Sequence, residues 1–88
     1  MTTMIGDWLY ADAWEGRVVI DRVDVSQRCR AVLVRGEVPV AVEVYRLTDA
    51  GRAFVLARDA RGAPAGLVTD VVVSRGISVQ LRPRREIP

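Results

Sequence analysis

The segment VPVAVEVYRLTDAGRAFVLAR (residues 38–58) contains two alternating apolar runs separated by one turn. Strict alternation over four to eight residues is typical of a β-strand with one buried face. A type I turn that begins at Thr48 and ends on Gly51, which can adopt positive φ, would join two such strands. The segment therefore predicts a β-hairpin in which Val44 lies opposite Leu56. The core face of this hairpin would carry Val40, Val42, Val44, Phe54 and Leu56.

Four further β-rich runs occupy residues 17–25, 29–35, 67–73 and 77–81, with turn signals between them. Strands at this spacing predict a mainly β protein, an antiparallel sheet folded as a barrel or sandwich of about six strands. A chain of 88 residues buries one modest core, because a second domain would be too small to form its own. We expect one β-rich domain over residues 1–81 and a basic disordered tail over residues 82–88, which is charged and interrupted by proline.

The segment DWLYADAWEG (residues 7–16) fits two structures. Asp7 is a suitable N-cap and Gly16 a suitable residue just after a helix C-terminus, which together favour one short helix. Trp8, Tyr10 and Trp14 also lie on one side of an alternating pattern, as they would in a strand. Because both end signals agree, we expect the helix.

The charge of the chain is concentrated at its end. All thirteen basic residues are arginine, and three of them lie in the last seven positions. Residues 1–81 contain ten arginines and ten acids, so the body is formally neutral and the net charge of +2 belongs to the tail. The basic isoelectric point therefore does not predict a basic surface.

The sequence lacks the residues on which most catalysis depends. It has no histidine, the usual general base near neutral pH, and no lysine, which a P-loop requires. Cys29 is the single cysteine, so an internal disulfide and a zinc site of the usual kind are excluded. We expect Cys29 to be a small buried apolar residue. The sequence thus indicates a protein that is not an enzyme and holds no cofactor or metal.

Two groups of residues are candidates for contact with a partner. The first is the aromatic cluster of Trp8, Tyr10 and Trp14, because large aromatic side chains dominate binding hot spots and stack on nucleic-acid bases. Burial in the core is the alternative for this cluster, and the commoner outcome for tryptophan. The second group is basic and could contact phosphates or an acidic partner; its members are Arg28, Arg30, Arg82, Arg84 and Arg85.

These observations favour a non-catalytic protein–protein interaction module that works in the cytoplasm and has no membrane contact. The bias toward arginine is typical of a GC-rich genome, and a small domain without chemistry suits a phage or mobile-element inhibitor of a host complex, of the anti-CRISPR type. A nucleic-acid-binding β-barrel that uses arginines and aromatic stacking is the alternative. The run Val71-Val72-Val73 offers apolar groups to both faces of a strand, so we also expect a homodimer formed through a strand edge.

Overall fold

The computed structural model describes residues 6–85 of the chain, which are mainly β. Its elements, in chain order, are nine strands and one short 3-10 turn. They are β1 (Asp7–Tyr10), β2 (Trp14–Ile20), β3 (Val23–Asp24), η1 (Ser26–Arg28), β4 (Cys29–Arg35), β5 (Val38–Tyr45), β6 (Leu56–Arg58), β7 (Pro64–Leu67), β8 (Thr69–Val73) and β9 (Ile77–Pro83).

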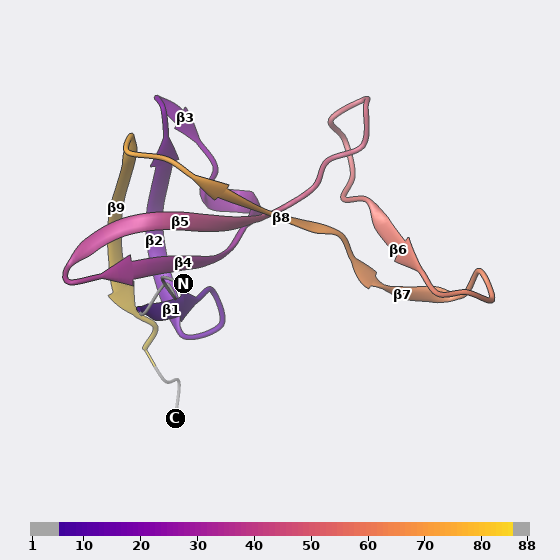
Figure 1. Ribbon diagram of the computed structural model, residues 1–88, viewed down its shortest axis with the longest axis horizontal. Helices are drawn as coiled ribbons and strands as arrows, with labels where there is room; N and C mark the ends of the chain where they lie inside the picture. The colour runs from indigo at the N-terminus through magenta and orange to yellow at the C-terminus, as the bar shows by residue number, and fades with distance from the viewer. Residues whose placement is uncertain (1–5, 86–88) are drawn as a thin grey trace, which may run out of the picture.

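Two antiparallel sheets form the body of the protein. One has the strand order β1-β4-β5-β8 and the other has the order β3-β2-β9. Figure 1 shows the strands of the first sheet running across those of the second, as in a sandwich with crossed layers. The predicted mainly β fold is therefore confirmed, and within residues 6–85 the sheets do not close into a barrel.

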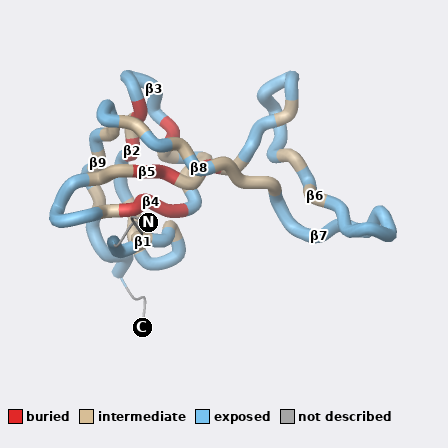
Figure 2. The backbone as a smooth tube through the Cα atoms, viewed as in Figure 1, coloured by how far each residue is buried: buried red, intermediate tan, exposed pale blue. Residues whose placement is uncertain are grey.

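The core lies between these two sheets and is built almost entirely of valine. Val32 and Val42 are its largest fully buried side chains, and Val18 and Ile20 face them from β2. Figure 2 shows that the buried positions fall mainly on the middle of β2, β4 and β5. β-Branched side chains are stiff and pack well on a pleated surface, so this composition suits a small sandwich with few large residues.

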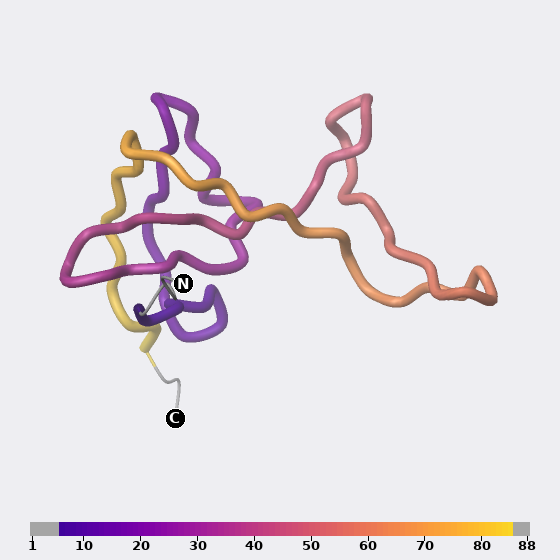
Figure 3. The backbone as a smooth tube through the Cα atoms, in the orientation of Figure 1, coloured from indigo at the N-terminus to yellow at the C-terminus, as the bar shows by residue number. Residues whose placement is uncertain are grey.

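A third sheet, β6-β7, stands apart from the body. It belongs to an arm, defined here as residues 46–68, which projects from the end of β5 and β8 (Figures 1 and 3). The chain leaves the body once, forms two hairpins and returns along the same narrow stem. The arm contains no buried residue.

The predicted hairpin over residues 38–58 is correct at its turn and wrong in its pairing. Gly51 has φ +68°, and its N–H donates to the carbonyl of Thr48 at 2.7 Å, as the turn requires. However, Leu47 bridges Phe54, and Val44 pairs with Cys29 and Asp70, not with Leu56. β5 lies in the middle of its sheet, so strands pair with both of its edges. β4 and β8 occupy those edges, so the second half of the predicted hairpin leaves for the arm.

The short helix predicted over residues 7–16 is also wrong, because this segment forms β1, a turn and the start of β2. Trp8 and Tyr10 pair with Leu33 and Ala31 along the edge of β4. This pairing satisfies backbone groups of β4 that a helix would leave open. Gly16 lies inside β2 and not after a helix: a Cβ atom there would be 1.9 Å from the carbonyl oxygen of Gln80 in the adjoining β9.

The C-terminal strand is longer than the sequence suggested. β9 continues through Arg82 and Pro83, which pair with Glu15 and Trp14 of β2. The first two residues of the predicted tail therefore belong to the three-stranded sheet. Residues 86–88, the end of that tail, lie outside the described residues.

Candidate functional site

The arm begins at a closed ring of three backbone hydrogen bonds. Arg46 donates its N–H to the carbonyl of Val68 at 2.9 Å, Val68 donates to Val55 at 2.9 Å, and Val55 donates to Arg46 at 2.8 Å. Each residue gives its N–H to one neighbour and accepts from the other, so three chain segments meet with their polar groups paired. The ring fixes the point at which the β5–β8 stem divides into two hairpins.

The shorter hairpin, residues 47–54, is held by few contacts. Its ends are joined by the Leu47–Phe54 bridge and by the Thr48 N–H, which donates to the carbonyl of Ala53 at 2.9 Å. The Phe54 ring stacks on Tyr45 with 5.0 Å between centroids, which ties the hairpin to the end of β5. Leu47 and Phe54 nevertheless remain 37% and 38% exposed.

The longer hairpin contains β6 and β7 and ends in an ordered tip. The Asp59 carboxylate accepts hydrogen bonds from the N–H groups of Arg61 and Ala63, and the Arg58 guanidinium donates to the carbonyl of Gly62. Behind the tip, Leu56 and Leu67 face each other across the two strands. These leucines are 43% and 44% exposed, so a pair of large apolar side chains lies on a ribbon with no second layer over it.

A groove of about 740 Å³ separates the shorter hairpin from the body. One wall is the segment 23–28, and the other consists of Leu47, Gly51 and Phe54. Val23, on the body wall, is also largely exposed. The groove therefore has apolar side chains on both walls, next to the polar residues of η1.

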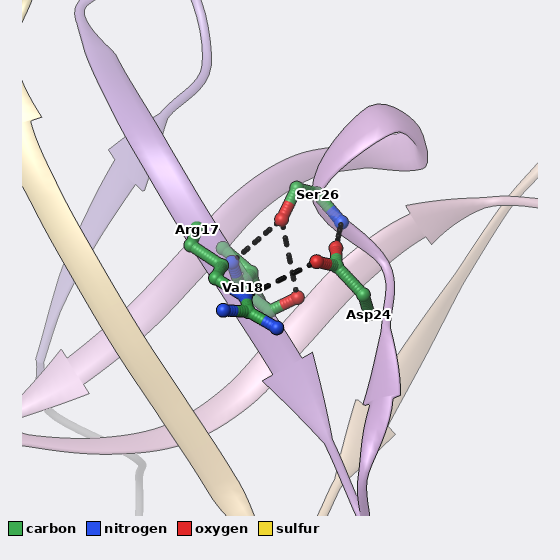
Figure 4. Close-up of polar contacts among 4 residues, drawn as sticks. All are labelled: Arg17, Val18, Asp24 and Ser26. Atoms are coloured by element: carbon green, nitrogen blue, oxygen red, sulfur yellow. Dashed lines mark hydrogen bonds and ion pairs between the residues drawn. The ribbon is translucent and has the colours of Figure 1, made fainter.

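Side-chain hydrogen bonds fasten the body wall of this groove to β2 (Figure 4). The Ser26 hydroxyl accepts the N–H of Val18 at 2.8 Å, and the Ser26 N–H donates to the Asp24 carboxylate at 2.9 Å. Arg17 donates its Nε–H to the same carboxylate at 3.2 Å. The hydrogen bonds from Ser26, together with the charge of Arg17, lower the pKa of Asp24.

The structure divides the predicted aromatic cluster between two sheets. Trp8 and Trp14 are half-buried on different sheets, whereas Tyr10 is exposed at the edge strand β1. The Arg30 guanidinium lies over the Tyr10 ring, 5.3 Å from its centroid, so the structure brings together one residue from each predicted group. Trp14 lines a cavity of about 60 Å³ beside Cys29, far smaller than the roughly 300 Å³ or more of a usual small-molecule site.

Most of the predicted arginines are engaged within the chain. Arg30 forms an ion pair with Glu43, while Arg82 and Arg84 both pair with Glu15. Arg28 donates to the carbonyl of Tyr45 at 3.3 Å, beside the base of the arm. Arg85 is exposed. Four of the five predicted arginines therefore have an acceptor within the chain.

Sequence reasoning missed the arm and its apolar side chains. Phe54 and Leu56, which we expected on the core face of the hairpin, are exposed. The sequence did not single out Leu47 or Leu67. The one signal in the sequence is the stretch 59–66, which has no apolar periodicity and directly follows the predicted hairpin. Cys29 is half-buried, and burial raises the pKa of its thiol, which agrees with a structural residue.

Within residues 6–85, no histidine, cysteine or acidic side chains gather in a group that could hold a metal ion. The same residues include no helix with the length and apolar character needed to cross a membrane. The chain matches no protein family model, no characterised protein and no solved structure.

Proposed function

We propose that this protein is a non-catalytic module that binds another protein through its arm and the groove beside it. The observation that carries the proposal is the exposure of four large apolar side chains on a projecting element whose base is fixed by the hydrogen-bonded ring. These side chains are Leu47, Phe54, Leu56 and Leu67.

The chemistry of the arm favours a protein partner. Residues 47–67 carry three arginines and two aspartates, so electrostatic attraction contributes little. Apolar surface of this kind is costly to leave in water, and large exposed apolar patches mark interaction sites. An exposed ribbon also offers unpaired backbone groups, to which an extended segment of a partner could add as a further strand. The groove beside it is large enough to receive side chains of the same partner.

The experiment uses a matched pair of variants. In Leu56→Thr/Leu67→Thr the arm loses its apolar pair but keeps residues that favour strands. In Val38→Thr an apolar side chain that is more exposed than either leucine changes at the far end of β5. Affinity capture from the native host with each protein, followed by mass spectrometry, identifies the partner, and calorimetry with the purified partner then measures affinity.

We expect wild type and Val38→Thr to bind equally. The double variant should bind at least about tenfold more weakly, because two leucines would lose contacts worth more than about 1.4 kcal/mol together. Equal binding by all three proteins would show that the partner contacts a surface other than the arm. Failure of the wild type to retain any protein reproducibly would contradict the function itself.

The more specific hypothesis of a phage or mobile-element inhibitor stays a prediction, and the identity of the captured partner tests it. Nucleic acid remains the alternative partner. Fluorescence anisotropy with single-stranded and duplex oligonucleotides at low salt addresses it, since phosphate contacts make affinity fall steeply as salt rises. The engagement of Arg30, Arg82 and Arg84 with carboxylates is the reason we favour protein.

A further inference from the structure

β8 is an edge strand of the four-stranded sheet. β5 pairs with one of its edges, and within residues 6–85 no strand pairs with the other. Val72 packs against the core, while Val71 and Val73 point to the opposite face and are 53% and 70% exposed. β8 therefore combines an unpaired backbone edge with an uncovered apolar face, the combination that promotes pairing with another strand.

The hydrogen-bond pattern shows which backbone groups of β8 are free to pair. Arg46 donates to Val68, its antiparallel partner at the end of the ladder. Directly opposed residues in an antiparallel pair alternate between hydrogen-bonded and non-bonded positions. Asp70 and Val72 are then the residues bonded to β5. Thr69, Val71 and Val73 direct their N–H and C=O groups toward the open edge.

This arrangement is self-complementary. β8 has five residues, and its central residue, Val71, is one of those with outward backbone groups. A two-fold axis at Val71 would place Val71 opposite the same residue of the second copy and Thr69 opposite Val73. Every outward group of the strand would then find a partner, as in an interface that uses the same patch on both subunits.

Charge selects the same register. Asp70 is the one charged residue in β8, and Arg46 donates to its carboxylate at 2.9 Å. With the axis at Val71, Asp70 faces Val72 of the second copy. Moving the axis by one residue toward the N-terminus would set Asp70 against itself, and like charges directly opposite are destabilising. Moving it by one residue the other way would pair only part of the strand.

The other open edges of the body are less suited to pairing. β3 has two residues, and β9 ends in Arg82 and Pro83, a charge and a residue without an N–H. β1 is four residues long and begins with Asp7. β8 also contains one charge, Asp70, but Arg46 pairs with it, and three valines follow.

We infer that the protein forms a homodimer in which two β8 strands pair antiparallel about a two-fold axis at Val71. The two four-stranded sheets then form one continuous sheet of eight strands. On the outer face, Val71 of each copy then lies beside Val71 of the other, and Val73 lies beside Thr69. Because the strands run in opposite directions, the two arms project from opposite ends of the joined sheet and each stays accessible. The dimer does not depend on the function proposed for the arm.

Cysteine cross-linking tests the register. In the Cys29→Ser background, Val71→Cys places two thiols opposite each other on the axis. Directly opposed Cα atoms in a hydrogen-bonded pair are about 5.5 Å apart, within the range of a disulfide. Val73→Cys is the matched control, since Val73 faces Thr69 of the other copy. With a copper–phenanthroline oxidant, we expect a covalent dimer from Val71→Cys and none from Val73→Cys. The reverse result would overturn the proposed pairing.

Sedimentation equilibrium tests the dimer without a cross-link. Val71→Arg should weaken dimerisation by at least about 100-fold, because opposed like charges cost several kcal/mol. The Val71 side chain lies outside the core, so the circular dichroism spectrum should not change. Val23→Arg adds the same charge at an exposed valine of the other sheet and should leave the dimer intact. A wild type that stays monomeric at high micromolar concentration, or a dimer that Val71→Arg leaves unchanged, would refute the inference.

Discussion

The body and the arm are both β-structure, but they differ in how far their apolar side chains are buried. In the body, Val42 of β5 is fully buried, since β2 and β9 lie across the inner face of its sheet. In the arm, Leu56 of β6 is 43% exposed although it also lies in a paired strand. Pairing satisfies backbone groups, whereas burial requires a second layer. The comparison shows that the arm gains its order from hydrogen bonds and contributes little to the core.

Among the substitutions considered, those of glycine should give the largest difference in stability between the body and the arm. Gly16→Ala should cost about 3 kcal/mol or more, because the new Cβ would lie 1.9 Å from the Gln80 oxygen and because φ is +144°. Gly66→Ala in the arm also has positive φ, but nothing lies within 4 Å of its Cβ, so we expect a cost of about 1 kcal/mol. Urea denaturation of both variants measures the difference. Equal costs would contradict the contrast between body and arm.

Truncation of an apolar side chain should give the second-largest difference in stability between the body and the arm. Val42→Ala should lower the free energy of unfolding by about 2 kcal/mol, from lost transfer energy and a cavity between the sheets. Leu56→Ala should change it by less than about 0.5 kcal/mol, as for other surface positions. Thermal and urea unfolding check both values. A large loss from Leu56→Ala would show that the arm packs against the body or against a second copy.

The ring at the base of the arm can be broken with one substitution. Val55→Pro removes the N–H group that donates to the carbonyl of Arg46. This substitution should lower the free energy of unfolding by about 1 kcal/mol. Val55→Ala keeps that N–H and serves as the control. Amide hydrogen exchange should show lost protection within residues 46–68 and unchanged protection in β2, β4 and β5. Loss of protection throughout the body would mean that the arm and the sandwich unfold as one unit.

Substitution of Asp24, in the body wall of the groove, should have the smallest effect on stability. The pKa of Asp24 is lower in the folded protein, so its contribution to stability is present above the unfolded pKa, close to 3.8, and is lost as pH falls through the folded value. Asp24→Asn should therefore be less stable than wild type at neutral pH, with the gap narrowing in acid. Urea midpoints at pH 7 and at successively lower pH values below 4 test this. A gap that stays constant with pH would contradict it.

Local patterns in the sequence determined the β class, the single layered core and the turn at Gly51. Alternating valines and positive-φ glycines act over a few residues, so they can be interpreted without knowing the rest of the fold. Such features account for the fold class, but they contributed little to the candidate site.

Tertiary structure decided which strands pair. Val44 could face Leu56 through a short turn or Asp70 through a much longer loop, and its local pattern is the same in both cases. Residues 7–10 could begin a helix or pair with β4, and the open edge of β4 decided between them. These choices depend on which strands pair with the edges of β4 and β5, which is a property of the whole sheet. β8, and not the segment that contains Leu56, pairs with β5. The chain between β5 and β8 therefore forms the arm, which has no second layer over it.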